Sequence, residues 1–315
     1  MPTSVRQLVK PSALHRGERI GIVAPASNVK RAELEAGCEA LRRAGYDPFY
    51  FDSILDRDLY FAGSIQRRIR EMEQMFSRDD TRAILCARGG YGANYLLNQL
   101  DLSKIKSDPK IFIGYSDITS LLTHFLDNAG LVTFHGPMAA KDWSHEHGVD
   151  LASWESALSQ TAAWEVKLND GVMALADGEA EGTLYGGCLS LLVASLGTPY
   201  EIKTAGTLLF VEDIAAKPYQ VDRMLMQLKL GGHLKNVRGI VFGEMVDCSQ
   251  STNQDYTLPE VITRIVADLN VPVAYGVTSG HVSSGNITLP FGVRSALSVG
   301  NGQVHLRILE SAVNP

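Results

Sequence analysis

The chain has 315 residues, of which 45% are hydrophobic and 20% are charged, and its formal net charge is −6. Length and composition are those of a globular protein large enough for two domains with sizeable cores. The acidic balance and the lack of a basic block argue against a nucleic-acid-binding surface. No apolar run approaches the roughly 20 residues that a membrane-spanning helix requires, so we expect no membrane partner.

Residues 1–19 contain no apolar core followed by a small-residue cleavage site, so the sequence predicts no signal peptide. The four cysteines lie far apart and form no Cys-x-x-Cys pair. This pattern favours buried, reduced thiols in a cytoplasmic protein over disulfides or a zinc site.

The first half of the chain alternates short apolar runs with amphipathic segments. We expect strands at 19–24, 47–51, 83–87, 111–114 and 131–134, and helices at 33–44, 65–76, 93–97 and from 116 onward. This alternation predicts a mostly parallel sheet with helices on both faces. Ligands of such sheets bind beyond the carboxyl ends of the strands, where Ser27, the pair Gly89-Gly90 and Ser116 all fall.

Ser116 is the first candidate for chemistry. The apolar strand ends at Gly114, and residues at helical spacing begin at Ile118, so Ser116 occupies a sharp strand-to-helix turn. A serine there holds its hydroxyl clear of the sheet beside the first N–H groups of the helix. The usual elbow has a second glycine, where this chain has Ile118. The alternative is that Ser116 only caps the helix, with Asp117 favoured by the helix dipole.

The loop Gly89-Gly90-Tyr91-Gly92 allows three interpretations. It could hold phosphate, although its spacing is not that of a phosphate-binding motif. It could give a backbone N–H to an oxyanion hole, or it could be a tight turn that needs positive φ. Arg88 is a candidate clamp for a substrate carboxylate, or simply a solvated charge.

The alternation breaks from 141 to about 182. We expect a linker with a short helix at 151–158, and a second domain that begins between 163 and 181. Strands are predicted at 207–211 and 239–242, helices at 221–230 and 258–269, and several short, hairpin-rich strands between 273 and 309.

Two further side chains suit a serine mechanism. Glu212-Asp213 ends a predicted strand, so one carboxylate could face a cleft or merely begin the next helix. His281 lies in a Gly/Ser turn, where packing gives no reason for a histidine. The order Ser, acid, His also occurs in α/β-hydrolases, although chain order is not diagnostic.

Several short motifs together resemble the LD-carboxypeptidase family, serine peptidases that include muramoyltetrapeptide carboxypeptidase and the microcin C immunity hydrolases. The resemblance runs from about 19 to 294. It is carried by the segments Ala87-Arg88-Gly89-Gly90-Tyr91-Gly92, Gly114-Tyr115-Ser116-Asp117-Ile118-Thr119, Phe134-His135-Gly136-Pro137-Met138, Phe210-Val211-Glu212-Asp213-Ile214 and Gly280-His281.

The resemblance implies roles for particular residues. Ser116 would be the nucleophile, His281 the general base and Glu212 the acid that orients it. Gly90 and Asp117 would give oxyanion-hole N–H groups. Arg88 and Gly89 are candidate contacts to substrate from their place in the sequence, and the resemblance assigns them no role. It also implies an α/β domain at 1–150, a linker at 151–180 and a smaller β-rich α+β domain at 181–315. The family needs no metal or cofactor, is usually dimeric, and is cytoplasmic in its recycling branch.

The implied reaction is removal of the C-terminal D-alanine from murein tetrapeptides. One alternative is a hydrolase of the same mechanism that acts on a peptidyl-nucleotide; its base would need an aromatic platform, for which Trp143, Trp154 and Trp164 are candidates. Another is a non-enzymatic phosphate- or nucleotide-binding protein that uses Gly89–Gly92. The chain departs from the expected pattern at Cys188, where an asparagine would follow Gly186-Gly187.

Overall fold

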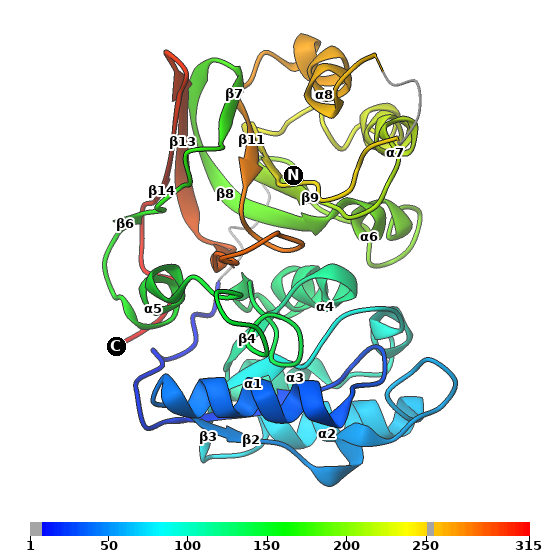
Figure 1. The fold of residues 1–315 in the computed structure, drawn as a ribbon, viewed down its shortest axis with the longest axis vertical. Coiled ribbons are helices and arrows are strands. Elements are labelled where there is room, and N and C mark those ends of the chain that lie inside the picture. The colour runs from blue at the N-terminus through cyan, green and yellow to red at the C-terminus, as the bar shows by residue number, and fades with distance from the viewer. Residues whose placement is uncertain (1–7, 251–254) are drawn as a thin grey trace.

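The computed structural model describes residues 8–250 and 255–315. The chain forms two sheets stacked along its long axis, the first in the blue and cyan half of the molecule and the second in the green to red half (Figure 1). The two halves meet where α4 lies against β8 and α6. In the described part of the chain, no helix is both long enough and apolar enough to cross a bilayer.

The first sheet has the strand order β12-β5-β4-β3-β1-β2. Its five N-terminal strands run parallel, as predicted, and β12 joins the edge antiparallel to β5. The elements of this half are β1 (Arg19–Val23), α1 (Arg31–Arg43), β2 (Asp47–Phe49), α2 (Ile65–Phe76), β3 (Thr81–Cys86), α3 (Leu102–Ser107), β4 (Ile111–Gly114), α4 (Thr119–His124), β5 (Thr133–His135), α5 (Leu151–Ser159) and β12 (Leu289–Phe291).

Helix α2 sets the position of two loops at the carboxyl end of this sheet. The Ser64 side chain caps the helix by accepting from the Arg67 N–H at 3.2 Å. The next residue, Arg68, is buried, and its Nη1 donates to the carbonyls of Pro25 and Gly92, both at 2.8 Å. One guanidinium therefore ties the loop after β1 to the loop after β3.

The second sheet has the order β6-β14-β13-β8-β9-β10-β11-β7, with β8 to β11 parallel and the other pairings antiparallel. Its strands are β6 (Trp164–Glu165), β7 (Met173–Ala176), β8 (Gly178–Cys188), β9 (Thr207–Glu212), β10 (Gly239–Gly243), β11 (Val273–Val277), β13 (Arg294–Gly300) and β14 (Gln303–Ile308). The helices are α6 (Leu189–Ala194), α7 (Pro218–Leu230) and α8 (Leu258–Val266).

The structure differs from the sequence-based expectations in several places. The helix expected at 93–97 is only a short 3-10 turn, Ala93–Leu96. The segment 151–180, expected as a linker with a short helix at 151–158, contains that helix as α5 but also contributes the edge strands β6 and β7. The run expected to be rich in hairpins is split, because β11 pairs parallel with β10 while β12 crosses into the first sheet. Strand patterns carry no information about which neighbour a strand will pair with.

Candidate active site

Ser116 lies on the turn between β4 and α4 in a left-handed conformation, with φ at +64°. A non-glycine residue adopts this conformation at a cost of about 1–3 kcal/mol, and such strain clusters at functional sites. The short helix that starts there has no side-chain cap, so capping is not what the Ser116 hydroxyl does. A Cβ on Gly89 would lie 2.8 Å from the Ser116 Cβ, so only glycine fits beside this turn.

The loop after β3 is held against the turn after β1. The Ser27 Oγ accepts from the Tyr91 N–H at 3.0 Å, and a Cβ on Gly90 would come within 2.3 Å of the same oxygen. Gly90 has φ at +101°, which favours glycine. Among the hydrogen bonds of the described residues, none uses the Gly90 N–H, so this donor is available to a ligand.

The Asp117 side chain also holds the glycine-rich loop after β3. It is buried, and its Oδ2 accepts from the Ala93 N–H at 2.7 Å. Burial raises the pKa of this carboxyl to about 6, although the Ala93 N–H and the Arg68 guanidinium oppose the shift. Its role in the fold is therefore to hold the glycine-rich loop, and any oxyanion contact from Asp117 would come from its backbone N–H.

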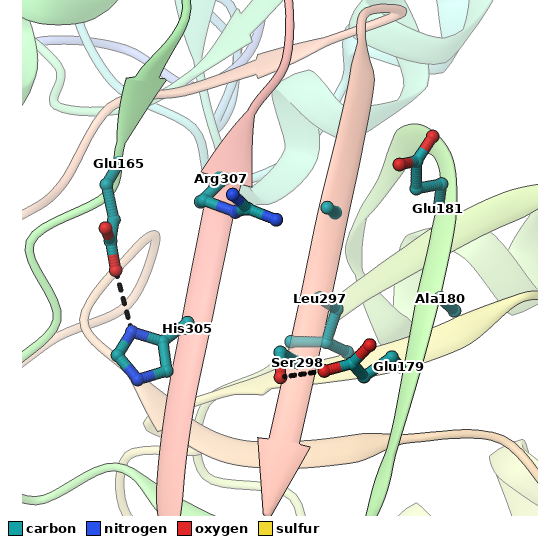
Figure 2. Close-up of a pocket in the computed structure, with 9 residues that line it drawn as sticks. Glu165, Glu179, Ala180, Glu181, Leu297, Ser298, His305 and Arg307 are labelled. Carbon is teal, nitrogen blue, oxygen red and sulfur yellow. Dashed lines mark hydrogen bonds and ion pairs between the residues drawn. The ribbon is translucent and has the colours of Figure 1, made fainter.

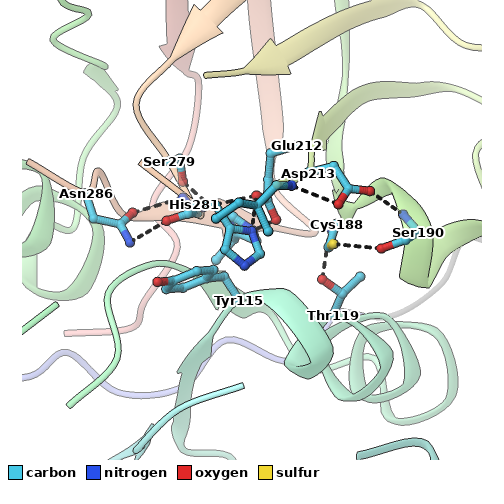
Figure 3. A network of polar contacts seen from close by, with 12 residues as sticks. Tyr115, Thr119, Cys188, Ser190, Glu212, Asp213, Ser279, His281 and Asn286 are labelled. Atoms are coloured by element: carbon cyan, nitrogen blue, oxygen red, sulfur yellow. Dashed lines mark hydrogen bonds and ion pairs between the residues drawn. The ribbon is translucent and has the colours of Figure 1, made fainter. Parts of the chain in front are cut away.

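Glu212 ends β9 with its side chain fully buried beside His281 (Figure 3). Its Oε2 accepts from the His281 backbone N–H at 3.0 Å and lies 2.7 Å from the His281 Nδ1. Burial opposes the ionisation of Glu212, but the charge and hydrogen bonds of His281, together with the nearby ring of His135, outweigh it and lower the pKa to about 2. Asp213 points away, accepting from the Ser190 N–H at 2.9 Å and the Ile214 N–H at 2.8 Å.

His281 follows β11 on a turn that other polar groups hold in shape. The Asn286 side chain accepts from the Gly280 N–H and donates to the Gly280 carbonyl, both at 3.0 Å (Figure 3). The ring of Tyr115 packs edge-on against the His281 ring, with centroids 5.1 Å apart. Burial lowers the pKa of His281, but the Glu212 carboxylate outweighs it, so the net shift is upward.

Ser116 and His281 line one cavity of about 370 Å³ between the two halves of the chain. No hydrogen bond between the Ser116 hydroxyl and the His281 ring occurs among those of the described residues. The cavity brings together two of the three predicted triad residues with the predicted loop. Its wall consists of Lys30, Glu33, Arg88, Gly89, Gly90, Tyr115, Ser116, Met138, Ala140, Lys141, His145, Ile214 and His281.

Arg88 has no carboxylate within ion-pair distance in the described part of the chain, and its Nη1 donates only to the Asn28 carbonyl at 3.3 Å. The cavity also contains charged groups that the sequence analysis did not select. Lys30 pairs with Glu33 at 2.8 Å, and Lys141 and His145 follow β5. The sequence could have indicated Lys30 and Glu33, because they follow the first predicted strand. Ligands of a parallel sheet bind beyond the carboxyl ends of its strands.

One group of described residues could hold a metal ion, namely Cys188, Glu212 and His281, whose ligand atoms lie within 4.8 Å of one another. The arrangement fits a metal poorly. Glu212 and His281 already bond to each other, and burial raises the pKa of the Cys188 thiol well above its usual range. The backbone N–H of Cys188 donates to the Thr119 hydroxyl at 3.0 Å, and this hydrogen bond joins the two halves of the chain (Figure 3).

Another hollow, of about 470 Å³, lies on the outer face of the second sheet across β6, β14, β13 and β8 (Figure 2). It shares no residue with the Ser116 cavity. Two of its acidic groups have partners, since Glu165 contacts His305 at 2.8 Å and Glu179 accepts from the Ser298 hydroxyl at 3.2 Å. None of the predicted site residues lines this second hollow.

The tryptophans do not provide an aromatic platform at that cavity. Trp143 and Trp154 are buried and pack edge-on against each other, with centroids 5.1 Å apart. Trp164 belongs to β6 at the edge of the second sheet. None of the three lines the Ser116 cavity.

Comparison with known proteins gives matches over both halves of the chain. Residues 20–136 match the LD-carboxypeptidase N-terminal domain, and residues 181–297 match the LD-carboxypeptidase C-terminal domain. A relative named probable murein peptide carboxypeptidase, from Bacillus subtilis (strain 168), is 38% identical over 292 residues, which cover 92% of this chain and 91% of the relative.

Two solved structures have a closely similar fold. The muramoyltetrapeptide carboxypeptidase from Oxalobacter formigenes superposes with a TM-score of 0.83 at 30% identity, covering 93% of this chain and 99% of the other. The microcin C7 self-immunity protein MccF, in its wild-type apo state, gives a TM-score of 0.90 at 25% identity, covering 97% of this chain and 100% of the other.

Proposed function

The chain belongs to the LD-carboxypeptidase family, and we propose that it removes the C-terminal D-alanine from murein tetrapeptides by a Ser-His-Glu acyl-enzyme mechanism. The observation that carries this proposal is a cavity lined by Ser116 and His281, with Glu212 bonded to the far side of the histidine ring. The similarity to the murein peptide carboxypeptidase of Bacillus subtilis supports the substrate class.

In the proposed mechanism, the Nε2 of His281 takes the proton of the Ser116 hydroxyl as its oxygen attacks the carbonyl of the last peptide bond. Glu212 stabilises the imidazolium that forms, because its Oε2 lies 2.7 Å from the opposite ring nitrogen. The N–H groups of Gly90 and Asp117 stabilise the oxyanion. The imidazolium then protonates the leaving D-alanine, and water hydrolyses the acyl-enzyme with His281 again acting as base.

Arg88 and Gly89 form the binding side of the proposed site. A guanidinium without a carboxylate partner, at the wall of the cavity, suits the terminal carboxylate that distinguishes a carboxypeptidase substrate from an internal peptide bond. Gly89 leaves room for the peptide beside Ser116, because any side chain there would contact the serine.

A second candidate function is hydrolysis of a peptidyl-nucleotide. The fold similarity to MccF favours it, since MccF structures include one with aspartyl sulfamoyl adenosine. The positions of the tryptophans disfavour it, because none of the three lines the Ser116 cavity, where the base would be stacked. Assaying the purified chain on a murein tetrapeptide and on a peptidyl-adenylate under the same conditions decides between the two. Faster release of D-alanine supports the first function, and preferential cleavage of the nucleotide replaces it with the second.

We also propose that the protein is cytoplasmic and homodimeric. The four cysteines are unpaired and buried, as in a reducing compartment. Helix α7 exposes Tyr219, Met226 and Leu230 on one side, with Leu230 82% exposed, and we assign this side to the contact with a second copy. Light scattering of the wild type and of Leu230→Glu tests it: a dimer that dissociates in the variant supports the assignment, and a wild-type monomer refutes it.

A further inference from the structure

The two carboxylate oxygens of Glu212 have different surroundings. Oε2 accepts both the backbone and the ring N–H of His281, whereas Oε1 is buried without a hydrogen-bond partner among the described residues. The polar atom that faces Oε1 is the Nε2 of His135, at 3.7 Å, and this nitrogen is likewise buried without a hydrogen bond. Each of these two buried polar atoms would lose its hydration without compensation if it had no partner. Because they face each other, we interpret them as partners in one polar contact.

The His135 ring is fixed in its orientation. It belongs to β5, is fully buried, and packs against the neighbouring rings of Phe210 and Phe291, with centroids 5.0 and 5.4 Å away. A Cβ on Gly280 would come within 2.8 Å of the His135 Cε1 and 2.7 Å of the Glu212 Cδ, so backbone covers both groups at once. This packing leaves the ring little freedom to turn its Nε2 away from the carboxylate.

The other ring nitrogen of His135 decides where the protons are. Nδ1 lies 3.0 Å from the Ser279 Oγ, which lies 2.8 Å from the Ile287 carbonyl oxygen. The Ser279 hydroxyl has one proton to donate. If it goes to the carbonyl, Nδ1 must carry a proton, and a neutral ring then presents a bare Nε2 to Oε1, so that two acceptors face each other in a dry site.

Two proton arrangements avoid that repulsion. In the first, the ring is doubly protonated, Nδ1–H donates to the Ser279 Oγ, and the Ser279 hydroxyl keeps its hydrogen bond to the Ile287 carbonyl. In the second, the Ser279 hydroxyl donates to Nδ1 and the neutral ring carries its proton on Nε2, at the cost of the hydrogen bond to the Ile287 carbonyl. Both place a proton on Nε2 facing Glu212. Burial lowers the pKa of His135 even though Glu212 opposes the shift, which favours the neutral form. A neutral donor has the advantage that it does not repel the imidazolium of His281 during catalysis.

We propose that His135 is a positioning residue, which donates its Nε2 proton to Oε1 of Glu212 and so keeps Oε2 directed at His281. The proposal rests on the function proposed above. It adds His135 to the three residues of the proposed mechanism, Ser116, His281 and Glu212. His135 does not line the cavity, so it acts on catalysis through Glu212 and not by contact with substrate.

Other ionisable groups lie close to Glu212 and His281. Asp213 and Asp142 act on the charge of His281, while Cys188 and Tyr115 lie close enough to Glu212 for its charge to raise their pKa values further. Asp213 and Asp142 have their own hydrogen-bond donors, and burial keeps Cys188 and Tyr115 protonated near neutral pH. A change in the pKa of His281 after substitution of His135 therefore reports on Glu212.

Two substitutions separate the two ring nitrogens. The amide of His135→Gln reaches the position of Nε2 and can donate to Oε1, whereas the amide of His135→Asn ends near Nδ1 and leaves Oε1 without a donor. His124→Asn is the matched control, because His124 is also buried and its Nδ1 has a partner, Asn128 at 2.9 Å, but it lies outside the cavity.

The primary measurement is the pKa of His281 by NMR titration, which needs no substrate. His135→Asn should raise it above the value in wild type and in His135→Gln, because a carboxylate with an unpaired oxygen holds the His281 proton more tightly. The kcat for murein tetrapeptide should fall about 10- to 100-fold with KM unchanged, as when an outer partner of a functional group is lost. His135→Gln should lose less, and His124→Asn should leave the pKa of His281 as it is.

The proposal is overturned if both His135 variants fold and show the same kcat, or if the pKa of His281 is the same in His135→Asn as in wild type. Should the variants not fold, ¹⁵N chemical shifts of His135 in the wild-type protein give the answer directly: a protonated Nε2 supports the proposal and a bare one refutes it. If the wild type releases no D-alanine, the proposed function is wrong. The NMR measurements still test the contact between His135 and Glu212, because they need no substrate.

Discussion

A single carboxylate oxygen of Glu212 holds His281 at two points, at 3.0 Å from its backbone nitrogen and 2.7 Å from its Nδ1. The first contact fixes the turn that carries the histidine, and the second fixes the orientation of the ring. Because Nδ1–H donates to the carboxylate, the Nε2 is the ring nitrogen that stays free to act as a base. The same residue therefore sets both the place and the tautomer of the proposed general base.

Replacing the proposed nucleophile tests the serine mechanism. Ser116→Ala should lower kcat by about four to six orders of magnitude, since members of a triad act as a unit. Its thermal unfolding should resemble that of the wild type, because the Ser116 hydroxyl makes no hydrogen bond among the described residues. Ser120→Ala, on the following helix, is the control. A Ser116→Ala enzyme with a kcat near that of the wild type would exclude the mechanism.

The acid is assigned to Glu212 and not to its neighbour. Glu212→Gln should lower kcat about 10⁴-fold, because an amide cannot stabilise the imidazolium and favours the wrong tautomer. Asp213→Asn should cost less than about tenfold, since Asp213 accepts from backbone N–H groups at the start of α6 and in the loop after β9 and does not contact His281 among the described residues. Steady-state kinetics of the two variants give the ranking, and the reverse order would move the role of acid to Asp213.

The pH dependence of kcat/KM should follow His281. The Glu212 carboxylate raises the pKa of this ring above the usual value of about 6.5, so the activity of the free enzyme should rise with pH through an apparent pKa above that value. His281→Ala should remove this limb together with most activity. A flat profile between about pH 5 and 8 would argue against a histidine base.

Buried Asp117 should make the protein less stable as pH rises. Its pKa in the fold, about 6, lies above that of an unfolded aspartate, so its ionisation favours the unfolded chain, and stability is lost between the two pKa values as pH increases. Asp117→Asn keeps an oxygen that can accept from the Ala93 N–H but carries no charge. The variant should therefore gain stability relative to wild type at pH 8 compared with pH 4, as urea unfolding at the two pH values would measure. An equal difference at both would contradict the assignment.

Arg88 should matter only for substrates with a free C-terminus. Arg88→Ala should reduce kcat/KM for the tetrapeptide by about one to two orders of magnitude, the amount expected from loss of a charge-assisted contact. A peptide with an amidated C-terminus should show little difference between variant and wild type. If both peptides are affected alike, Arg88 supports the loop through Asn28 and does not bind the carboxylate.

The sequence by itself was enough to predict the parallel first sheet and the turn at Ser116. Alternation of apolar runs and helical spacing is a local property, so a linear pattern records it. It also carried the motifs in which Glu212 and His281 occur, although choosing Glu212 over Asp213 rested on resemblance. Neighbouring acids at a strand end differ only in which way they point, and a linear pattern does not contain that information.

Only the tertiary structure decided which groups share the cavity. Lys30 and Glu33 lie at the start of α1, Lys141 and His145 lie in the loop after β5, and each alone looks like an ordinary surface residue. The crossing of β12 into the first sheet pairs it with β5, the strand that carries His135, and the turn after β11 sets Ser279 beside the same ring. Whether a buried histidine merely fills space or holds a carboxylate depends on what lies opposite its nitrogens, and for His135 those groups, Glu212 and Ser279, are far away in the sequence.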